Sequence, residues 1–222
     1  MKAVILAAGS GSRLGSPLPK AFLKIGGRTL IQRTMDNLSE MEISSDDVLV
    51  VTGFRGELFV DAGLQCVHNP LWRFPGTLSS FLTPEYSSCE LLVIHGDLLW
   101  EVGLLKSVQS HPGDILVPVD PRNRLNGEAM KAEVRQGRIV HLSKDLPEHR
   151  SAGESMGVFL IRRPELLRKT AKTLLWKPQA TLDDAVNIAA GSIEVNAVFT
   201  EDCKWEEIDT RADLERGEEL FS

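Results

Sequence analysis

Two cationic residues and three closely spaced glycines near the start of the chain are of the residue types that bind phosphate. Gly9, Gly11 and Gly15 alternate with serines in L-A-A-G-S-G-S-R-L-G, and Arg13 and Lys20 lie in or just after this run. Glycine lets backbone N–H groups approach a phosphate because it has no Cβ, while arginine offers a two-pronged donor and lysine a point charge. Because a short apolar run that reads as a strand precedes them, these residues predict a triphosphate-binding loop rather than an ordinary surface loop.

Two well-known glycine motifs do not fit this loop. The string G-x-x-x-x-G-K-[ST] occurs nowhere in the chain, which excludes a Walker-type P-loop. The dinucleotide fingerprint G-x-G-x-x-G must open a helix directly, but here the third glycine comes one residue late, and Pro17 and Pro19 prevent a helix from starting there. The loop therefore predicts a different type of nucleotide site.

Two aspartates are candidates for binding a divalent cation. Asp97 follows an apolar strand in the sequence H-G-D, and Asp209 ends the sequence W-E-E-I-D. In open α/β sheets, ligands bind beyond the carboxyl ends of the strands, and carboxylates are good ligands for Mg²⁺. Each aspartate could equally cap the helix expected after it. The residues alone leave both interpretations open, and we expect the nearby His95 to be structural.

The first loop, followed by P-K, resembles the N-terminal motif of nucleotidyltransferases of the MobA-like and NDP-sugar synthase type, which make NDP-sugars and CDP-alcohols. The resemblance implies that the loop wraps a nucleoside triphosphate and that Arg13 and Lys20 contact its phosphates. It also implies that Asp97 and Asp209 bind Mg²⁺. Asp213 is a weaker third candidate, which we expect instead to be a residue of the first turn of a helix. The family fold is a Rossmann-like α/β domain with a mixed, mostly parallel sheet and helices on both faces.

Later segments resemble small CTP-dependent phosphocholine and 2-aminoethylphosphonate cytidylyltransferases. The segments are H-N-P, F-P-G-T-L-S-S, M-K, S-K, G-E-S-M-G and W-E-E-I-D-T. A phosphorylated acceptor needs cations, and Lys131 and Lys144 could supply them, although strand lysines can also be exposed edge residues that discourage aggregation. Glu154 could bind an amine headgroup or orient a lysine. The M-K, S-K and G-E-S-M-G segments that contain these residues are spaced as in the cytidylyltransferases that the chain resembles. The nucleotide-binding residues that this resemblance implies are Leu6, Ala7, Ala8, Gly9, Ser10, Gly11, Ser12, Arg13, Lys20, Thr52, Gly53, Asn69, Gly76, Thr77 and Ser79.

The predicted reaction is Mg²⁺-dependent transfer of CMP from CTP, or of NMP from another NTP, to a small phosphorylated or phosphonate alcohol, with release of pyrophosphate. The acceptor oxygen is already anionic near neutral pH, so no general base is needed. Catalysis then depends on positioning and charge neutralisation by Mg²⁺ and by Arg13, Lys20, Lys131 and Lys144. Trp72, Phe74 and Trp100 could form a cation–π wall for a choline-like headgroup, although aromatic side chains near loops more often simply pack.

Other functions remain open at this point. A sugar-1-phosphate or molybdopterin nucleotidyltransferase would share the first loop, and a glycosyltransferase on a related fold would release no pyrophosphate. A non-catalytic nucleotide-sensing module would keep the fold without needing all of Arg13, Lys20, Asp97 and Asp209. The presence of all four favours an enzyme.

Composition restricts the class of protein. The chain has 222 residues, is 42% hydrophobic and carries a formal net charge of −6, which fits a globular domain and argues against a nucleic-acid partner. Its three cysteines are widely spaced, which predicts reduced thiols rather than a zinc site or disulfides. We see neither a signal peptide nor an apolar stretch of membrane-spanning length. We therefore expect a cytoplasmic location without membrane insertion, and a homodimer is one option for its assembly.

Hydrophobic periodicity predicts a single domain over residues 1–222, with a nucleotide-binding half (1–120) and a substrate-binding half (121–222) that ends in a helix. Strands and helices alternate in the first half, which implies a mostly parallel sheet, and a small antiparallel pair opens the second half. The predicted strands are 3–6, 47–52, 65–68, 90–95, 114–119, 129–134, 138–142, 156–161 and 194–198. The predicted helices are 29–41, 56–62, 101–110, 164–173, 181–190 and one from about 211.

Overall fold

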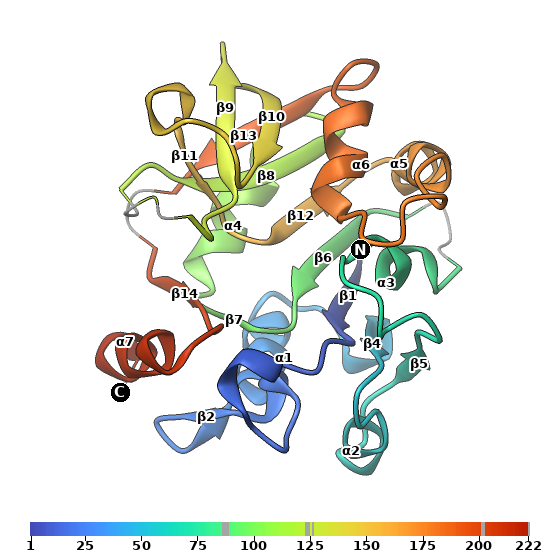
Figure 1. The fold of residues 1–222 in the computed structure, drawn as a ribbon, viewed down its shortest axis with the longest axis vertical. Coiled ribbons are helices and arrows are strands. Elements are labelled where there is room, and N and C mark those ends of the chain that lie inside the picture. The colour runs from blue at the N-terminus through green and yellow to red at the C-terminus, as the bar shows by residue number, and fades with distance from the viewer. Residues whose placement is uncertain (86–88, 123–124, 126, 201–202, 222) are drawn as a thin grey trace.

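A ten-stranded mixed β-sheet runs through the centre of the molecule (Figure 1). The structure is a computed structural model, and it describes residues 1–85, 89–122, 125, 127–200 and 203–221. The strand order is β11-β9-β10-β13-β8-β12-β6-β1-β4-β5. The strands are β1 Lys2–Ala7, β4 Val48–Thr52, β5 Cys66–His68, β6 Leu91–His95, β8 Ile115–Asp120, β9 Lys131–Arg135, β10 Arg138–Ser143, β11 Gly153–Ser155, β12 Val158–Ile161 and β13 Val195–Phe199.

The strand directions confirm the predicted α/β class. Within this described sheet, seven of the ten strands run in the same direction and β10, β11 and β12 run opposite to them. The neighbours β5, β4, β1 and β6 are parallel, as the alternation of strands and helices predicts. Strands β9, β10 and β11 form the expected antiparallel region in the second half of the chain.

Helices cover both faces of the sheet because successive strand residues face opposite sides. The helices are α1 Leu30–Glu40, α2 Glu57–Asp61, α3 Leu78–Leu82, α4 Gly103–Gln109, α5 Pro164–Lys172, α6 Leu182–Ala189 and α7 Arg211–Phe221. In β1, Val4 and Leu6 join the core beneath α3, α5 and α6, whereas Ala3 and Ile5 join the core beneath α1, α2 and α4. In the part of the chain that the structure describes, none of the helices is long and apolar enough to span a membrane.

The helix starts follow from local sequence signals. Thr29 caps α1 and forms a capping box with Gln32, and Thr181 caps α6 in the same way with Asp184. Pro164 occupies the first turn of α5, where its missing N–H leaves no hydrogen bond unmade. The predicted helices therefore begin and end within a few residues of the observed ones.

A small second sheet joins the end of the chain to its middle. Strand β7 (Leu98–Trp100) pairs antiparallel with β14 (Trp205–Glu207), with Trp205 opposite Trp100 and Glu207 opposite Leu98. Just beyond this pair, the backbone N–H of Ile208 donates to the carbonyl of Asp97 at 2.9 Å. This pairing brings the two predicted metal-binding aspartates to the same place. A further short hairpin is formed by β2 (Lys24–Ile25) and β3 (Arg28–Thr29).

The loop before α3 is fixed to the start of α6. The N–H of Leu78 donates to the carbonyl of Ala180 at 3.1 Å, and the hydroxyl of Thr77 accepts from the N–H of Leu182 at 2.9 Å. Gly76 makes this contact possible because its φ is +102°, and a Cβ there would lie 2.3 Å from the Ala180 carbonyl oxygen. Only glycine fits such a position without displacing the neighbouring backbone.

Replacement of Gly76 by alanine is therefore expected to destabilise the protein by at least about 2 kcal/mol, since the left-handed backbone and the backbone clash both oppose a side chain. The midpoint of urea unfolding measures the effect. Gly127→Ala is the matched control, because no atom lies within 4 Å of the Cβ that it would add. Equal unfolding midpoints for the two variants would contradict the close packing of this loop.

Candidate active site

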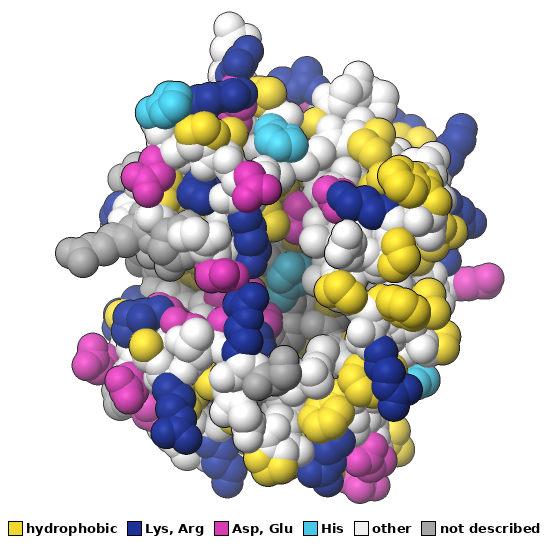
Figure 2. Space-filling model, viewed as in Figure 1, with side chains coloured by type: hydrophobic (Ala, Val, Ile, Leu, Met, Phe, Trp, Pro, Cys, Tyr) yellow, Lys and Arg dark blue, Asp and Glu magenta, His cyan; other side chains and the backbone are white. Residues whose placement is uncertain are grey.

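The carboxyl end of β1 opens into two adjoining cavities, of about 280 and 530 Å³. Figure 2 shows this face of the molecule, hollowed near its centre, with charged side chains along one margin and hydrophobic ones along the other. We call the smaller space the phosphate cavity and the larger one the main cavity. Leu6, Gly9, Asp97 and Lys144 line both. The phosphate cavity is also lined by Ala7, Gly11, Arg13, Lys20, Ala21, Gly96 and Asp209.

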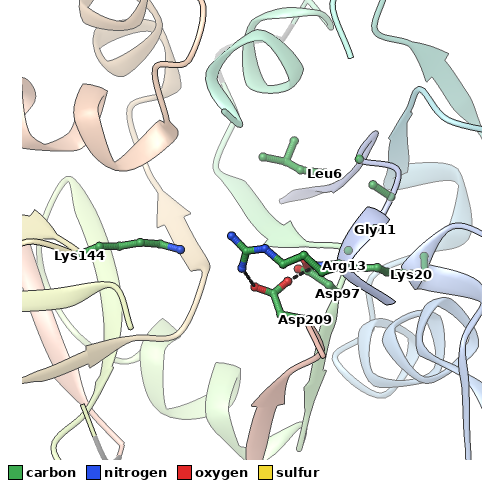
Figure 3. A pocket seen from close by; sticks show the side chains of 11 residues that line it. Leu6, Gly11, Arg13, Lys20, Asp97, Lys144 and Asp209 are labelled. Atoms are coloured by element: carbon green, nitrogen blue, oxygen red, sulfur yellow. Dashed lines mark hydrogen bonds and ion pairs between the residues drawn. The ribbon is translucent and has the colours of Figure 1, made fainter. Parts of the chain in front are cut away.

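The glycine loop and Lys20 fit together closely. Gly11 has a φ of +61°, and a Cβ at this position would lie 2.7 Å from the Lys20 Cγ. The absence of a side chain at Gly11 therefore gives the lysine stem its path into the cavity. Arg13 lies in the short 3₁₀ turn Ser12–Leu14 and Lys20 opens another, Lys20–Phe22. The predicted loop thus brings both of its cations to one space (Figure 3).

Lys20 lies between the two predicted metal-binding carboxylates. Its ammonium donates to Asp97 at 2.9 Å and also to Asp209. Burial lowers the pKa of Lys20, but the two carboxylates outweigh this effect and raise the pKa above its usual value. Burial alone would raise the pKa of Asp97, whereas Lys20 and then His95 hold it below its usual range. Lys20 and Asp97 are therefore both charged at neutral pH.

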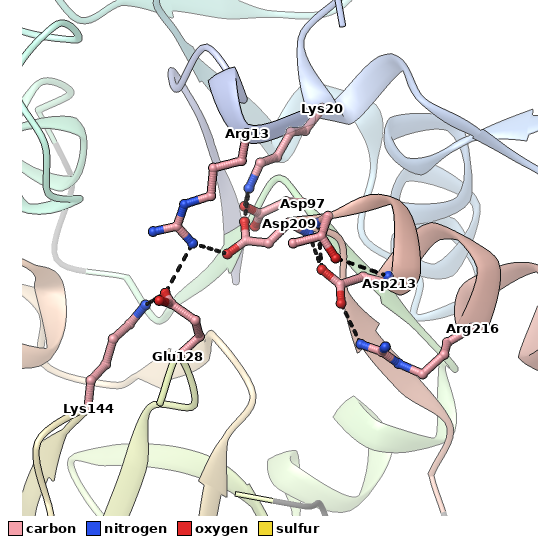
Figure 4. A network of polar contacts seen from close by, with 9 residues as sticks. Arg13, Lys20, Asp97, Glu128, Lys144, Asp209, Asp213 and Arg216 are labelled. Atoms are coloured by element: carbon pink, nitrogen blue, oxygen red, sulfur yellow. Dashed lines mark hydrogen bonds and ion pairs between the residues drawn. The ribbon is translucent and has the colours of Figure 1, made fainter. Parts of the chain in front are cut away.

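A series of ion pairs connects Arg13 and Lys144, which both line the phosphate cavity, through Glu128 (Figure 4). The Arg13 guanidinium donates to Glu128 at 3.0 Å and to Asp209 at 3.4 Å, and the Lys144 ammonium donates to Glu128 at 3.2 Å. Arg13 comes from the first half of the chain and Lys144 from the second, and Figure 3 shows the two side chains reaching toward one another. The two side chains of the Arg13–Glu128 pair are 56% and 62% exposed, so this bond contributes little to stability and costs little to break.

The carboxylates in this region fit a hard divalent cation. Asp97 and Asp209 converge on the Lys20 ammonium, and oxygen ligands are those that Mg²⁺ prefers. His95, Asp97 and Glu207 also lie close together, with one potential ligand atom from each within 4.8 Å of the others. The sequence analysis missed Glu207, although it stands in the same W-E-E-I-D-T motif as Asp209. His95 is a poor ligand for Mg²⁺ because its donor is an imidazole nitrogen. The donors that fit Mg²⁺ are therefore the carboxylates of Asp97, Asp209 and Glu207.

Asp213, the weaker candidate for metal binding, is engaged in hydrogen bonds and an ion pair within the protein. Its carboxylate accepts from the N–H groups of Asp209 at 2.9 Å and Thr210 at 2.6 Å, and it also pairs with Arg216. These bonds are those of a residue in the first turn of a helix, and they fix the backbone of Asp209. Asp213 therefore holds the second aspartate in position (Figure 4).

The main cavity collects many of the predicted nucleotide contacts. Ala8, Ser10, Asn69, Gly76 and Thr77 line it, together with Gly9 and Leu6, already named. Trp72 and Phe74 lie in its wall as well.

Asn69 supports this wall from beneath. It is buried, donates to Ser79 and Ser80 at 3.0 Å each, and accepts from the N–H of Leu71 at 2.9 Å. It therefore ties the loop after β5 to α3 and so shapes the cavity.

Three other predicted nucleotide residues, Thr52, Gly53 and Ser79, lie outside the described walls of both cavities. Ser79 accepts from Asn69, whereas Ser12 begins the first 3₁₀ turn and its side chain lies outside the described part of the structure. Thr52 is buried at the end of β4. A Cβ at Gly53 would lie 2.3 Å from the Trp72 Cβ and 2.6 Å from the Ala8 carbonyl oxygen, so this glycine permits close packing under the loop.

Two of the predicted acceptor residues face away from the main cavity. Lys131 is buried, and its ammonium donates to the backbone carbonyl of Lys144. Glu154 stands opposite Lys131 in the pairing of β11 with β9 and lines a third cavity of about 450 Å³, together with Glu206, Asp213 and other residues. Of the predicted acceptor set, Lys144 is the residue that lines the main and phosphate cavities.

The predicted aromatic wall does not form as a unit. Trp72 and Phe74 line the main cavity, but Trp100 is buried in the core, paired across β7 and β14 with Trp205. Trp72 instead packs against Phe54 and has the Arg73 guanidinium 4.8 Å above its ring. Trp100 therefore packs in the core, which is the alternative that the sequence favours for aromatic residues near loops.

Glu154 lies in surroundings that favour its neutral form. Burial raises its pKa to about 7, and the nearby Glu206 and Asp120 add to this, against the opposing effect of Lys131. The folded state therefore keeps a proton that the unfolded chain, with an ordinary glutamate pKa, gives up near pH 4.5. Stability from this group is complete below about pH 4.5 and is lost as the pH rises toward about 7.

Glu154→Gln is accordingly expected to become more stable, relative to the unmodified protein, by about 3 kcal/mol between pH 4.5 and pH 8. Urea unfolding at several pH values within this window measures the change. Glu148→Gln, at an exposed glutamate, should leave the pH dependence unaltered. A pH dependence that is the same in the Glu154 variant and the unmodified protein would contradict the raised pKa.

Comparison with known proteins places this geometry in a family. Residues 3–181 match the model of the MobA-like NTP transferase domain. A curated relative, the bifunctional IPC transferase and DIPP synthase of Rubrobacter xylanophilus, is 30% identical over 98% of this chain and 51% of its own length. The CMP-5'-(3-aminopropyl)phosphonate synthase of Streptomyces rubellomurinus is 25% identical over the whole of this chain and 39% of its own. The chain thus spans about half or less of the length of these relatives.

Solved structures show the same fold over nearly the whole chain. The inositol-1-phosphate CTP transferase from T. maritima superposes with a TM-score of 0.80 at 25% sequence identity, covering 99% of this chain and 94% of that one. The fold similarity extends beyond residue 181, where the family match ends, and so includes β13, β14 and α7.

Proposed function

Because the chain belongs to the family of MobA-like NTP transferase domains, we propose that it transfers CMP from CTP to a small phosphorylated or phosphonate alcohol and releases pyrophosphate. The observation that carries this proposal is the phosphate cavity, in which Arg13, Lys20 and Lys144 meet Asp97 and Asp209. Cations from both halves of the chain and carboxylates suited to Mg²⁺ are what phosphoryl chemistry on two charged substrates requires. The division into nucleotide and substrate halves at about residue 120 is part of the proposal.

The choice of CTP is supported by the relatives. The inositol-1-phosphate CTP transferase names CTP together with a phosphate acceptor. The CMP-5'-(3-aminopropyl)phosphonate synthase names CMP together with a phosphonate. Both acceptors present an anionic oxygen to the nucleotide. This chain has a lysine, Lys144, at the point where the two cavities meet, and a cation there suits an anionic acceptor.

The chain's own residues then act mainly by positioning. The N–H groups of the glycine loop, Arg13 and Lys20 hold the triphosphate, and Lys144 holds the acceptor phosphate next to it. The acceptor oxygen is already ionised near neutral pH, so no residue has to remove a proton. When bound by Asp97 and Asp209, with Glu207 beside them, Mg²⁺ would act as a Lewis acid that neutralises phosphate oxygens. Binding of the two substrates would replace Glu128 as the partner of Arg13 and Lys144.

Pyrophosphate release in the presence of Mg²⁺ tests this function. CTP, UTP, GTP and ATP are each combined with inositol phosphate, glycerol phosphate, phosphocholine, 2-aminoethylphosphonate and hexose 1-phosphates. Release with CTP and one of the first four acceptors would support the proposal. Release that requires UTP, GTP or ATP and a hexose phosphate would replace it by a sugar-1-phosphate nucleotidyltransferase. Nucleotide binding without release in any combination would favour a sensing module.

A further inference from the structure

The main cavity contains buried polar atoms that bond to nothing within the protein. Among the described residues, three buried side-chain nitrogen or oxygen atoms have no hydrogen-bond partner, and two of these, Ser155 Oγ and His95 Nε2, belong to residues that line this cavity. A buried polar atom without a partner lowers stability, so such atoms persist where something else bonds to them. Ser155 is only 5% exposed. The third atom, Trp100 Nε1, belongs to the core.

A carboxyl group from a third element lines the same cavity as these two residues. Asp183, in the first turn of α6, is 5% exposed and lines the same cavity. Burial raises the pKa of Asp183 and so disfavours its charged form, while the nearby His95 lowers this pKa. A carboxyl group that is not held fully ionised can both donate and accept a hydrogen bond.

The three residues come from three elements that meet at the main cavity. His95 ends β6 and Ser155 ends β11. The backbone N–H of His95 donates to the carbonyl of Gly157 at 3.0 Å, which holds the segment after β11 against the end of β6. Lys144, the proposed phosphate ligand of the acceptor, lines this cavity too. The nucleotide loops that follow β1 and β5 supply other parts of its wall. Hydrogen-bonding groups from β6, β11 and α6 thus line the same cavity as the lysine proposed to hold the acceptor phosphate.

This set of groups matches hydroxyls better than a cationic headgroup. A hydroxyl both donates and accepts, as serine, imidazole and carboxyl groups do. A quaternary ammonium makes no such bonds and is bound by several aromatic faces; Trp72 and Phe74 line this cavity, but Trp100 is in the core and leaves that wall incomplete. Glu154, the predicted partner of an amine, lines the third cavity instead. We propose that His95, Ser155 and Asp183 form a subsite for hydroxyl groups, which selects a polyhydroxylated phosphate, such as a cyclitol or sugar phosphate, over aminoalkyl or choline phosphates. This inference rests on the proposed function.

Ser155→Ala provides the first test, because removal of an unsatisfied hydroxyl should not lower stability. We expect an unchanged or higher melting temperature together with a KM for inositol 1-phosphate that rises about 10-fold, which is the loss expected for one hydrogen bond, at unchanged KM for CTP. Asp183→Asn should behave similarly toward the acceptor. Ser192→Ala, whose hydroxyl donates to the Ala189 carbonyl at 3.2 Å and which lines neither cavity, is the matched control.

Monodeoxy analogues of the acceptor identify the bond itself. If Ser155 bonds to one hydroxyl, the analogue that lacks this hydroxyl should be turned over equally well by the Ser155→Ala variant and by the unmodified protein. A rise in the KM for CTP with no change for the acceptor would overturn the inference in favour of recognition of the base. Better turnover of phosphocholine or 2-aminoethylphosphonate than of every polyol phosphate would also overturn it, while leaving cytidylyl transfer intact.

Direct binding keeps the inference separate from the proposed function. If no combination of substrates releases pyrophosphate, the proposed function fails. Calorimetric titration of inositol 1-phosphate into the protein then decides on the subsite alone. Binding that is about 10-fold weaker in Ser155→Ala than in Ser192→Ala would sustain the subsite, and equal or undetectable binding in all variants would refute it.

Discussion

Asp97→Ala is expected to lower the rate of pyrophosphate release by at least about 10³-fold, the scale of losing a charged group that acts on the transition state, and to leave the fold intact. Asp97 lines both cavities and accepts from Lys20. Its removal takes away one of the two carboxylates that converge on this point and releases Lys20 to Asp209 alone. Because its side chain lies beyond the carboxyl end of β6 and outside the core clusters, the rest of the structure does not depend on it.

The measurement is steady-state turnover at saturating CTP and acceptor, with circular dichroism and the melting temperature as checks of folding. Asp145→Ala removes an exposed aspartate from the second half of the chain and should retain full activity. Asp97→Asn, which keeps the shape and removes the charge, should lose nearly as much as the alanine variant. Near-normal turnover in either Asp97 variant would refute the metal assignment.

The sequence was sufficient to predict the parts of the site that are local. Gly11, Arg13 and Lys20 lie within ten residues of each other, and the loop that they form follows directly from β1. Asp97 is predictable for a similar reason, since it comes two residues after the end of an apolar strand that pairs with β1. Parallel neighbours bring their carboxyl ends to one edge of a sheet, so both segments had to meet.

Asp209 could not be placed in this way. It reaches Asp97 because β14 pairs with β7, and each of these strands has only three residues. Such short strands carry no detectable periodicity, and they are separated by about half of the chain. The resemblance to a family, rather than any local pattern, led to Asp209. The cytoplasmic location and the homodimer remain predictions.

In two neighbouring segments, the residue that lines the main cavity is one position away from the residue predicted to bind the acceptor. Glu154 and Lys131 are opposite each other and share a face, whereas Ser155 and Met130, the adjacent residues, line the main cavity. Successive residues of a strand face opposite sides, so a shift of one residue moves every side chain to the other face. The charged residue is the more conspicuous in a sequence, but here the serine beside it faces the cavity.

Lys20→Met is expected to separate two roles of the lysine. Methionine keeps most of the side-chain volume that fills the space beneath Gly11, but it leaves Asp97 and Asp209 without their shared cation. Two carboxylates close together repel each other, so the variant should melt at a lower temperature than the unmodified protein in the absence of divalent cations. Turnover should fall by about 10²- to 10³-fold, because a positive charge next to the triphosphate is lost.

Added Mg²⁺ should raise the melting temperature of Lys20→Met more than that of the unmodified protein. In the unmodified protein the cation has to compete with the Lys20 ammonium for the same carboxylates, and stabilisation by a ligand grows with its affinity for the folded state. Thermal unfolding over a range of Mg²⁺ concentrations measures this difference, and Lys106→Met, at an exposed lysine paired with Glu40, is the control. If Mg²⁺ shifts all three proteins equally, the ammonium and the metal do not compete, and the cation binds elsewhere than between Asp97 and Asp209.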